Sequence, residues 1–99
     1  MTNLYNNTKI YKLECNKSGL IYIGVTTNKY LSQRLVTHMT TYKYFKSGKT
    51  IKEQPYFKIL EEQDYDLSLL EEFNCNSKDG QAVRHKYYIN LFKKKIVDI

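Results

Sequence analysis

The chain has 99 residues, which is enough for one domain with a single hydrophobic core and too few for two. With 41% hydrophobic residues and no apolar run of membrane-spanning length, the composition excludes a disordered chain and a membrane-spanning one, so we expect a soluble, intracellular protein. The formal net charge of +6 favours a polyanionic partner, although the abundance of Lys, Asn, Ile and Tyr is also what AT-rich coding produces.

Cysteine and arginine are scarce enough to be informative. Cys15 and Cys75 lack metal-ligand spacing and are too few for a disulfide framework, so we expect two reduced thiols in or near strands. Of the 16 basic residues, only Arg34 and Arg84 are arginines. A guanidinium is planar, always charged and able to bind an anion through two parallel hydrogen bonds, so these two positions are candidates for anion recognition.

The first part of the chain predicts a β-hairpin. Residues 1–8 are polar and are expected to form a loose lead-in. Residues 9–15 alternate between two faces and residues 20–25 are β-branched and apolar, which is typical of strands. Residues 16–19 supply a turn that ends in a glycine. Gly24, near the end of the second strand, indicates a close approach of another group to the backbone.

A helix is predicted after the hairpin. Thr26, Thr27 and Asn28 are candidate N-caps, and Ser47 and Gly48 mark the end of the helix. Between them, side chains recur at spacings of three and four, the pattern of an amphipathic helix. These side chains are Leu31, Arg34, Leu35, His38, Tyr42 and Phe45.

A short helix and a third strand are predicted next. Pro55 fits the first turn of a helix over residues 56–62, and residues 64–66 are expected to form a turn. Residues 67–73 predict a strand whose apolar side chains alternate. These side chains are Leu67, Leu69 and Phe73.

The last predicted element is a helix over residues 81–94. Its apolar stripe follows the helical period and includes a histidine. The stripe is Ala82, His85, Ile89, Phe92 and Ile96. The predicted order is β-β-α-α-β-α in one domain over residues 1–99. This order indicates an α+β fold with a small three-stranded antiparallel-type sheet flanked by helices.

Two tyrosines and an Arg/His pair form the first candidate site. Tyr11 and Tyr22 lie on adjacent strands of the predicted hairpin, where their phenols can move protons or hold a water molecule. Ten tyrosines in the chain make ordinary core or surface packing the alternative for each. Arg34 and His38 are four residues apart and therefore share one face of the predicted helix.

Arg34 is predicted to lie on the inward face of that helix. It therefore needs an anionic partner there, because an unpaired buried charge is very costly. A phosphate would serve, with the guanidinium stabilising the charge that develops in phosphoryl transfer. The alternative is a salt bridge to Glu71 or Glu72. His38 is a candidate general acid or base, or a hydrogen-bonded half-buried histidine.

Basic and aromatic residues interleave after this pair. Such a surface can follow a nucleic-acid backbone and stack on bases, whereas the alternative is a solvated helix end and loop. The candidate nucleic-acid-binding residues are Lys43, Lys46, Lys49 and Lys52.

The ordered set of these motifs resembles the GIY-YIG nuclease superfamily. Residues 9–11 read Lys-Ile-Tyr, and residues 22–24 read Tyr-Ile-Gly after ten intervening residues. Arg34 follows ten residues after the glycine, with His38 one turn later, as in homing-endonuclease and large-DNA-virus members of the family. Residues 84–89 resemble the tail of the pattern. The resemblance covers essentially the whole chain.

The resemblance implies metal-dependent hydrolysis of a DNA phosphodiester. Tyr11 would act as the general base or position the attacking water, and Tyr22 would bind that water or the scissile phosphate. Arg34 would stabilise the transition state, and His38 would assist at the phosphate or in proton transfer. The family's single Mg²⁺, or Mn²⁺ in its place, would be bound by a glutamate on the last helix.

The sequence departs from the family pattern at three positions. Lys9 stands in the place of the first glycine, and Asp98 is a poor substitute for an asparagine expected near the C-terminus. His85 occupies the position of the metal-binding glutamate, and a neutral imidazole is a poor ligand for Mg²⁺. Glu71 or Glu72 would have to reach in from the third strand to replace it.

Several functions therefore remain open. The chain can be a working endonuclease that uses Mn²⁺ or a borrowed acid, a degenerate nuclease kept as a DNA-binding or protein-interaction module, or an active-site variant engineered at His85. Outside the nucleases, the same scaffold can serve as a basic adaptor or inhibitor of another protein. Because no separate DNA-recognition domain is present, structure-selective or weakly specific DNA binding is expected.

Overall fold

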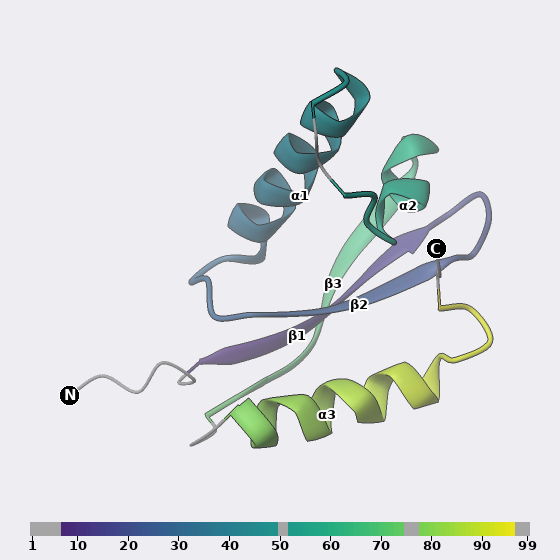
Figure 1. Ribbon diagram of the computed structural model, residues 1–99. Coiled ribbons are helices and arrows are strands. Elements are labelled where there is room, and N and C mark those ends of the chain that lie inside the picture. Colours follow the sequence, from purple (N-terminus) through teal and green to yellow (C-terminus); the bar gives the residue numbers. More distant parts are fainter. Residues whose placement is uncertain (1–6, 50–51, 75–77, 97–99) are drawn as a thin grey trace.

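The fold is an α+β arrangement in which three strands and three helices follow the order β-β-α-α-β-α, as the sequence predicts (Figure 1). The computed structural model describes residues 7–49, 52–74 and 78–96. Within these ranges, no helix combines the length and the apolar character that crossing a bilayer requires. The elements are β1 (Thr8–Cys15), β2 (Ile21–Thr26), α1 (Leu31–Lys46), α2 (Phe57–Glu61), β3 (Tyr65–Phe73) and α3 (Lys78–Leu91).

The sheet is antiparallel and has the strand order β2-β1-β3. β1 lies in the middle and is the most buried strand, with Ile10, Tyr11, Leu13 and Cys15 fully buried. β1 begins at Thr8, one residue earlier than predicted. The hairpin to β2 turns at Gly19, whose φ of +78° suits a glycine.

Helices cover both faces of the sheet (Figure 1). On one face, α1 and α2 pack over a core that includes Leu13, Cys15 and Leu60. On the other face, α3 packs over Ile10, Ile21 and Ile23. The alternation of side chains along β1 therefore divides the interior into two small cores, and β2 is left as an edge strand between α1 and α3.

A β-bulge in β3 changes which residues face each helix layer. The pairing with β1 shifts between Ile10, which lies opposite Glu71, and Tyr11, which lies opposite Leu69. Leu67 consequently packs in the core under α1 and α2, while Phe73 packs against α3. The prediction that the apolar side chains of this strand share one face was therefore wrong for Phe73, because one extra residue reverses the alternation.

The predicted ends of three elements need correction. β3 already begins at Tyr65, where a turn was predicted, and α2 begins at Phe57, after the turn that contains Pro55. α3 spans Lys78–Leu91 rather than residues 81–94, so Ile96 lies beyond the helix, where it forms a parallel bridge with Ile21 of β2. Ala82 is exposed and does not belong to the buried stripe of the helix.

The predicted N-caps of α1 have another role. The residue that caps α1 is Tyr30, whose backbone N–H donates to the side chain of Gln33 at 3.2 Å. Thr26 and Asn28 instead bond to each other in the loop before the helix, with the Asn28 N–H donating to Thr26 Oγ1 at 3.1 Å. This loop is stabilised by local side-chain hydrogen bonds rather than by the helix dipole.

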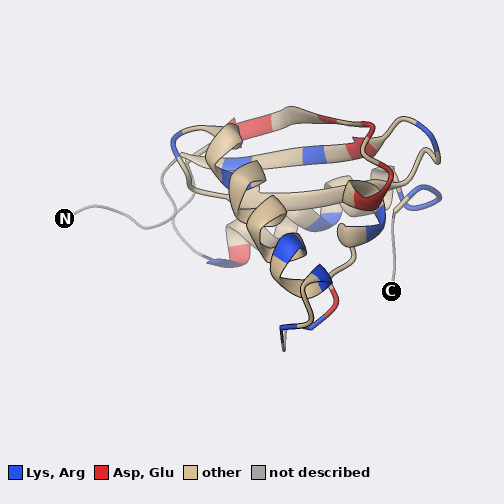
Figure 2. Ribbon diagram, turned by 90° about the horizontal axis from the view of Figure 1, so that it is seen from above, with Lys and Arg blue, Asp and Glu red and all other residues tan. Residues whose placement is uncertain are grey.

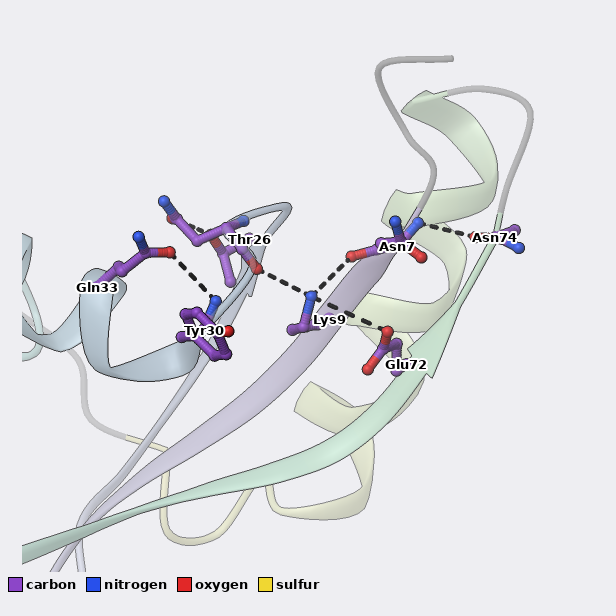
Figure 3. A network of polar contacts seen from close by, with 8 residues as sticks. Asn7, Lys9, Thr26, Tyr30, Gln33, Glu72 and Asn74 are labelled. Carbon is purple, nitrogen blue, oxygen red and sulfur yellow. Dashed lines mark hydrogen bonds and ion pairs between the residues drawn. The ribbon is translucent and has the colours of Figure 1, made fainter. Parts of the chain in front are cut away.

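Lys9 ties that loop to the start of β1 (Figure 3). Its buried ammonium donates to the backbone carbonyl of Asn28 at 2.9 Å and to that of Asn7 at 3.4 Å, and it lies 4.0 Å from Glu72 at the end of β3. A further hydrogen bond, from the Asn7 N–H to Asn74 Oδ1 at 2.8 Å, joins the residue before β1 to the residue after β3. Lys9 is thus accommodated in an extended strand.

Candidate functional site

Tyr11 lies directly opposite Gly24 across the two strands of the hairpin. They are direct partners across the β1–β2 pairing, and a Cβ added at Gly24 would lie 2.1 Å from Tyr11 Cζ and 2.2 Å from its hydroxyl oxygen. The ring of Tyr11 therefore lies across the glycine. The close approach predicted at Gly24 is confirmed, and it fixes where the phenol of Tyr11 points.

The Tyr11 hydroxyl joins two residues of α1. His38 Nε2 lies 2.6 Å from the hydroxyl oxygen, and Arg34 Nε donates to the same oxygen at 3.3 Å. Their spacing of four residues puts Arg34 and His38 on one face of the helix, above the ring of Tyr11. His38 is 1% exposed, so the pair is shielded from solvent on the histidine side.

Burial sets the protonation of this pair. It lowers the pKa of His38 to about 4, with a further lowering from the charge of Arg34. It raises the pKa of Tyr11 to about 12, against a smaller lowering by the hydrogen bond from Arg34. At neutral pH the imidazole is therefore neutral and the phenol keeps its proton. Because Arg34 can only donate, the Tyr11 oxygen accepts that bond and can give its own proton to His38.

Two more tyrosines complete an aromatic cluster around His38. The ring centroid of Tyr22 lies 5.7 Å from that of His38, and the centroid of Tyr56 lies 4.0 Å away on another side. Burial raises the pKa of both phenols above the ordinary value. Tyr56 was not predicted as a site residue, and only the apolar spacing of α2, which packs its first turn against the sheet, could have indicated it.

Arg34 lies beside this cluster without a carboxylate partner. Among residues 7–49, 52–74 and 78–96, every ion pair involves another cation. Glu71 binds the other arginine, Arg84, at 2.5 Å and also accepts from the hydroxyl of Tyr88 at 2.8 Å. The alternative of a salt bridge from Arg34 to Glu71 or Glu72 was therefore wrong.

His85 approaches the site from the opposite helix layer. Its Nε2 lies 2.8 Å from the backbone carbonyl of Ile23 on the outer edge of β2. Because a carbonyl can only accept, Nε2 carries the proton and Nδ1 is the basic nitrogen. His85 lines a hollow of about 320 Å³ together with Tyr22 and Gly24, so this hollow connects α3 to the tyrosine cluster around the edge of the sheet.

The donors at this hollow do not fit Mg²⁺. Apart from His85, its lining residues are Tyr22, Gly24, Val25, Lys78, Gln81 and Ala82, none of which carries a carboxylate. Within the described part of the chain, no three His, Cys, Asp or Glu side chains gather as a metal-binding group. Glu71, considered as a substitute ligand, is occupied by Arg84, and its strand lies on the far side of β1. Mg²⁺ prefers hard oxygen ligands, so the residues that line this hollow provide no magnesium site.

The predicted nucleic-acid-binding lysines lie at the other end of α1. Lys43 and Lys46 are exposed in its last turn, and Lys49 Nζ lies 5.0 Å from the ring centroid of Tyr44. At 1.5 Å per residue, Lys46 lies roughly 18 Å along the helix from Arg34. Lys52 is exposed as well. These lysines and the tyrosine cluster are thus separate regions of one helix layer, and their role in nucleic-acid binding stays a prediction.

Two sequence predictions fall partly or wholly outside the described residues. Cys15 is a buried, reduced thiol in β1, as expected, whereas Cys75 and Asp98 lie outside the described residues.

The buried imidazole of His38 predicts a specific loss of stability in acid. The unfolded chain protonates this histidine below about pH 6.5, while the folded chain protonates it only near pH 4, so the free energy of unfolding falls as the pH falls between these values. We expect a decrease of about 2 kcal/mol from pH 7 to pH 4.5 that is absent in His38→Gln, whose amide can still accept from Tyr11. Urea unfolding of the parent and of His38→Gln at the two pH values measures this decrease. An equal change in the free energy of unfolding of the two proteins would contradict the prediction.

Comparison of this chain with family models, with curated proteins and with solved structures finds no match in any of the three.

Proposed function

We propose that this chain is a GIY-YIG-type domain that binds DNA phosphodiesters at the cluster of Tyr11, Tyr22, Arg34 and His38. We further propose that it hydrolyses them poorly with Mg²⁺, because His85 stands in place of a carboxylate. The observation that carries the proposal is the state of Arg34, a partly buried guanidinium beside two phenols and a neutral imidazole, with no carboxylate bound to it within the described residues.

The guanidinium has donors to offer a phosphate. Its Nε is used by the Tyr11 hydroxyl, and within the described residues the two terminal nitrogens make no hydrogen bond to protein. Two parallel N–H groups match the oxygens of a phosphodiester, and an environment of low polarity strengthens such a charge-assisted bond. A phosphate bound here would lie next to Tyr11, where a water molecule could attack it.

Tyr11 and His38 would then act as a proton relay. With a pKa of about 12, only roughly one Tyr11 in 10⁵ is ionised at pH 7, so a resident phenolate is a poor general base. A relay avoids this difficulty, because Tyr11 passes its proton to the neutral imidazole as it accepts one from the attacking water. The distance of 2.6 Å between Tyr11 Oη and His38 Nε2 suits this transfer.

A non-hydrolytic function is the second candidate, and the donor set at His85 favours it. A domain that keeps the phosphate-binding arginine but lacks a metal-binding carboxylate would bind DNA without cleaving it. In that case the chain is a DNA-binding or protein-interaction module on a nuclease scaffold. Binding and cleavage must therefore be measured separately.

The two arginines provide a matched test of the phosphate site. We expect Arg34→Gln to weaken binding to a short DNA duplex about tenfold, and to lower the slope of log K against log[salt] by about one, because one phosphate contact is lost. Arg84→Gln removes the same charge from a guanidinium already neutralised by Glu71 and is expected to leave the affinity unchanged. Fluorescence anisotropy between 50 and 200 mM salt measures both. Equal affinities for the parent and Arg34→Gln would remove Arg34 from the phosphate site.

A further inference from the structure

A second cavity, with four lysines among its nine lining residues, lies at the C-terminal end of α3. Its volume is about 420 Å³, and its lining includes Lys12 of β1 and the three consecutive residues Lys93, Lys94 and Lys95, with Glu14 as the one acidic residue. Figure 2 shows the blue segments of this lysine loop beside the sheet, near the C-terminus. Lys12 is paired with Glu14, whereas Lys93, Lys94 and Lys95 are exposed and form no ion pair within the described residues, so an anion that bridges them would be attracted by three charges.

The chain holds these lysines in a defined place. The loop turns tightly, with the Lys95 N–H donating to the carbonyl of Phe92 at 2.8 Å, and it then pairs with the edge of β2, where the Ile21 N–H donates to the carbonyl of Lys95 at 2.7 Å. Beneath the loop, Lys12 lies 5.5 Å from the ring of Phe92 and 3.0 Å from Glu14. Backbone bonds fix the loop, so its lysine side chains are left available to bind a ligand.

This cavity and the hollow at His85 lie along the same pair of elements. Both are bordered by β2 and α3, the cavity at Ile21 and the last turn of the helix, and the hollow at Gly24 and the first half of the helix. Ile21 and Gly24 are separated by roughly 10 Å along the strand. One strand of DNA advances 3.4 Å per phosphate along the duplex axis, so this interval corresponds to about three phosphates.

We propose that the lysine cavity binds the backbone of the same DNA strand, about three phosphates from the point at which the strand passes the hollow beside Tyr22. This inference rests on the proposed function, because it places the second contact relative to the first. Electrostatics supports nucleic acid as the ligand, since Lys93, Lys94 and Lys95 present their charges at exposed positions along one loop, which an extended phosphate backbone can follow. The two contacts together would orient the strand along the edge of β2.

If the two sites bind one strand, the cavity lysines should contribute to the affinity only for DNA long enough to reach both sites. We expect Lys93→Ala/Lys94→Ala to weaken binding to a 12-nucleotide strand in a duplex with its complement about tenfold or more, and to leave binding to a dinucleotide, which reaches only one site, within about twofold of the parent. The control is Lys17→Ala/Lys86→Ala, which removes the same net charge at residues outside the cavity lining. The control is expected to bind the longer strand at least fivefold more tightly than the cavity variant.

The other outcomes separate this inference from the proposed function. Equal losses in the two double variants would reduce the effect to net charge and overturn the inference. Binding of inorganic phosphate at the cavity, without any dependence on DNA length, would also overturn it, because the site would then serve a free anion. If Arg34→Gln has no effect while the cavity variant still loses affinity for the longer strand, the first site fails and the cavity remains a DNA contact.

Discussion

Replacing His85 by glutamate is expected to raise Mg²⁺-dependent cleavage of DNA by about 100-fold over the parent. The hollow beside Tyr22 lacks a carboxylate, and His85 occupies the position on α3 from which one would face it. A carboxylate there would supply the hard oxygen ligand that Mg²⁺ prefers, and metal stabilisation of phosphoryl charge is worth several kcal/mol, of which about 3 kcal/mol gives the stated factor. Conversion of supercoiled plasmid to nicked and linear forms, with and without EDTA, measures the change.

Glutamine at the same position is the matched control. His85 donates to the carbonyl of Ile23, a bond that glutamine can reproduce and ionised glutamate cannot. His85→Gln is therefore expected to be at least as stable as His85→Glu and to remain as inactive as the parent in Mg²⁺. If the parent itself cuts efficiently in Mg²⁺, the proposal of an impaired site is wrong. If neither variant cuts while Arg34-dependent binding persists, the domain is a DNA-binding module.

Gly24→Ala is expected to destabilise the fold by about 2–3 kcal/mol. The added methyl group would lie 2.1 Å from Tyr11 Cζ, and the buried ring cannot move without disturbing His38 and Arg34. Overpacking of a close contact of this kind typically costs 1–3 kcal/mol. Urea unfolding gives the loss of stability. The same variant should also lose DNA affinity, because Tyr11 would no longer hold Arg34.

A double-mutant cycle with Tyr11→Leu tests whether that cost comes from the ring. Leucine keeps the side chain as far as Cδ and lacks the atoms nearest to the added methyl group, which are Cε1, Cζ and Oη of Tyr11. In the Tyr11→Leu background, Gly24→Ala should therefore change the free energy of unfolding by less than about 0.5 kcal/mol. Additive effects of the two substitutions would show that the glycine is required for another reason.

The elements, and the placement of Arg34 and His38 on one helix face, could be predicted because each depends on local sequence. Alternation along residues 9–15 predicts the central strand, and a spacing of four residues puts Arg34 and His38 on one face of α1. The turn before β2 and the glycine opposite Tyr11 are likewise recognisable from a single residue type. The α+β class follows from the order of these elements.

Other features depend on partners that are distant in the chain, and local patterns carry no signal for them. The bulge in β3 exists only because of its pairing with β1, so the side-chain directions after Leu69 could not be predicted. The place of Tyr56 at the histidine ring results from the packing of α2 on the sheet. The ion pair between Glu71 and Arg84 could not be predicted either, because the sequence equally allows Glu71 to bind Arg34.

The attachment of Lys9 has a consequence for how the sequence can vary. Its ammonium donates to backbone carbonyls of residues 7 and 28, and every amino acid supplies such a carbonyl. A change of side chain at residue 7 or 28 therefore leaves these two hydrogen bonds of Lys9 available. Lys9 thus attaches the loop before α1 to the start of β1 through main-chain atoms, in addition to the side-chain bonds between Thr26 and Asn28.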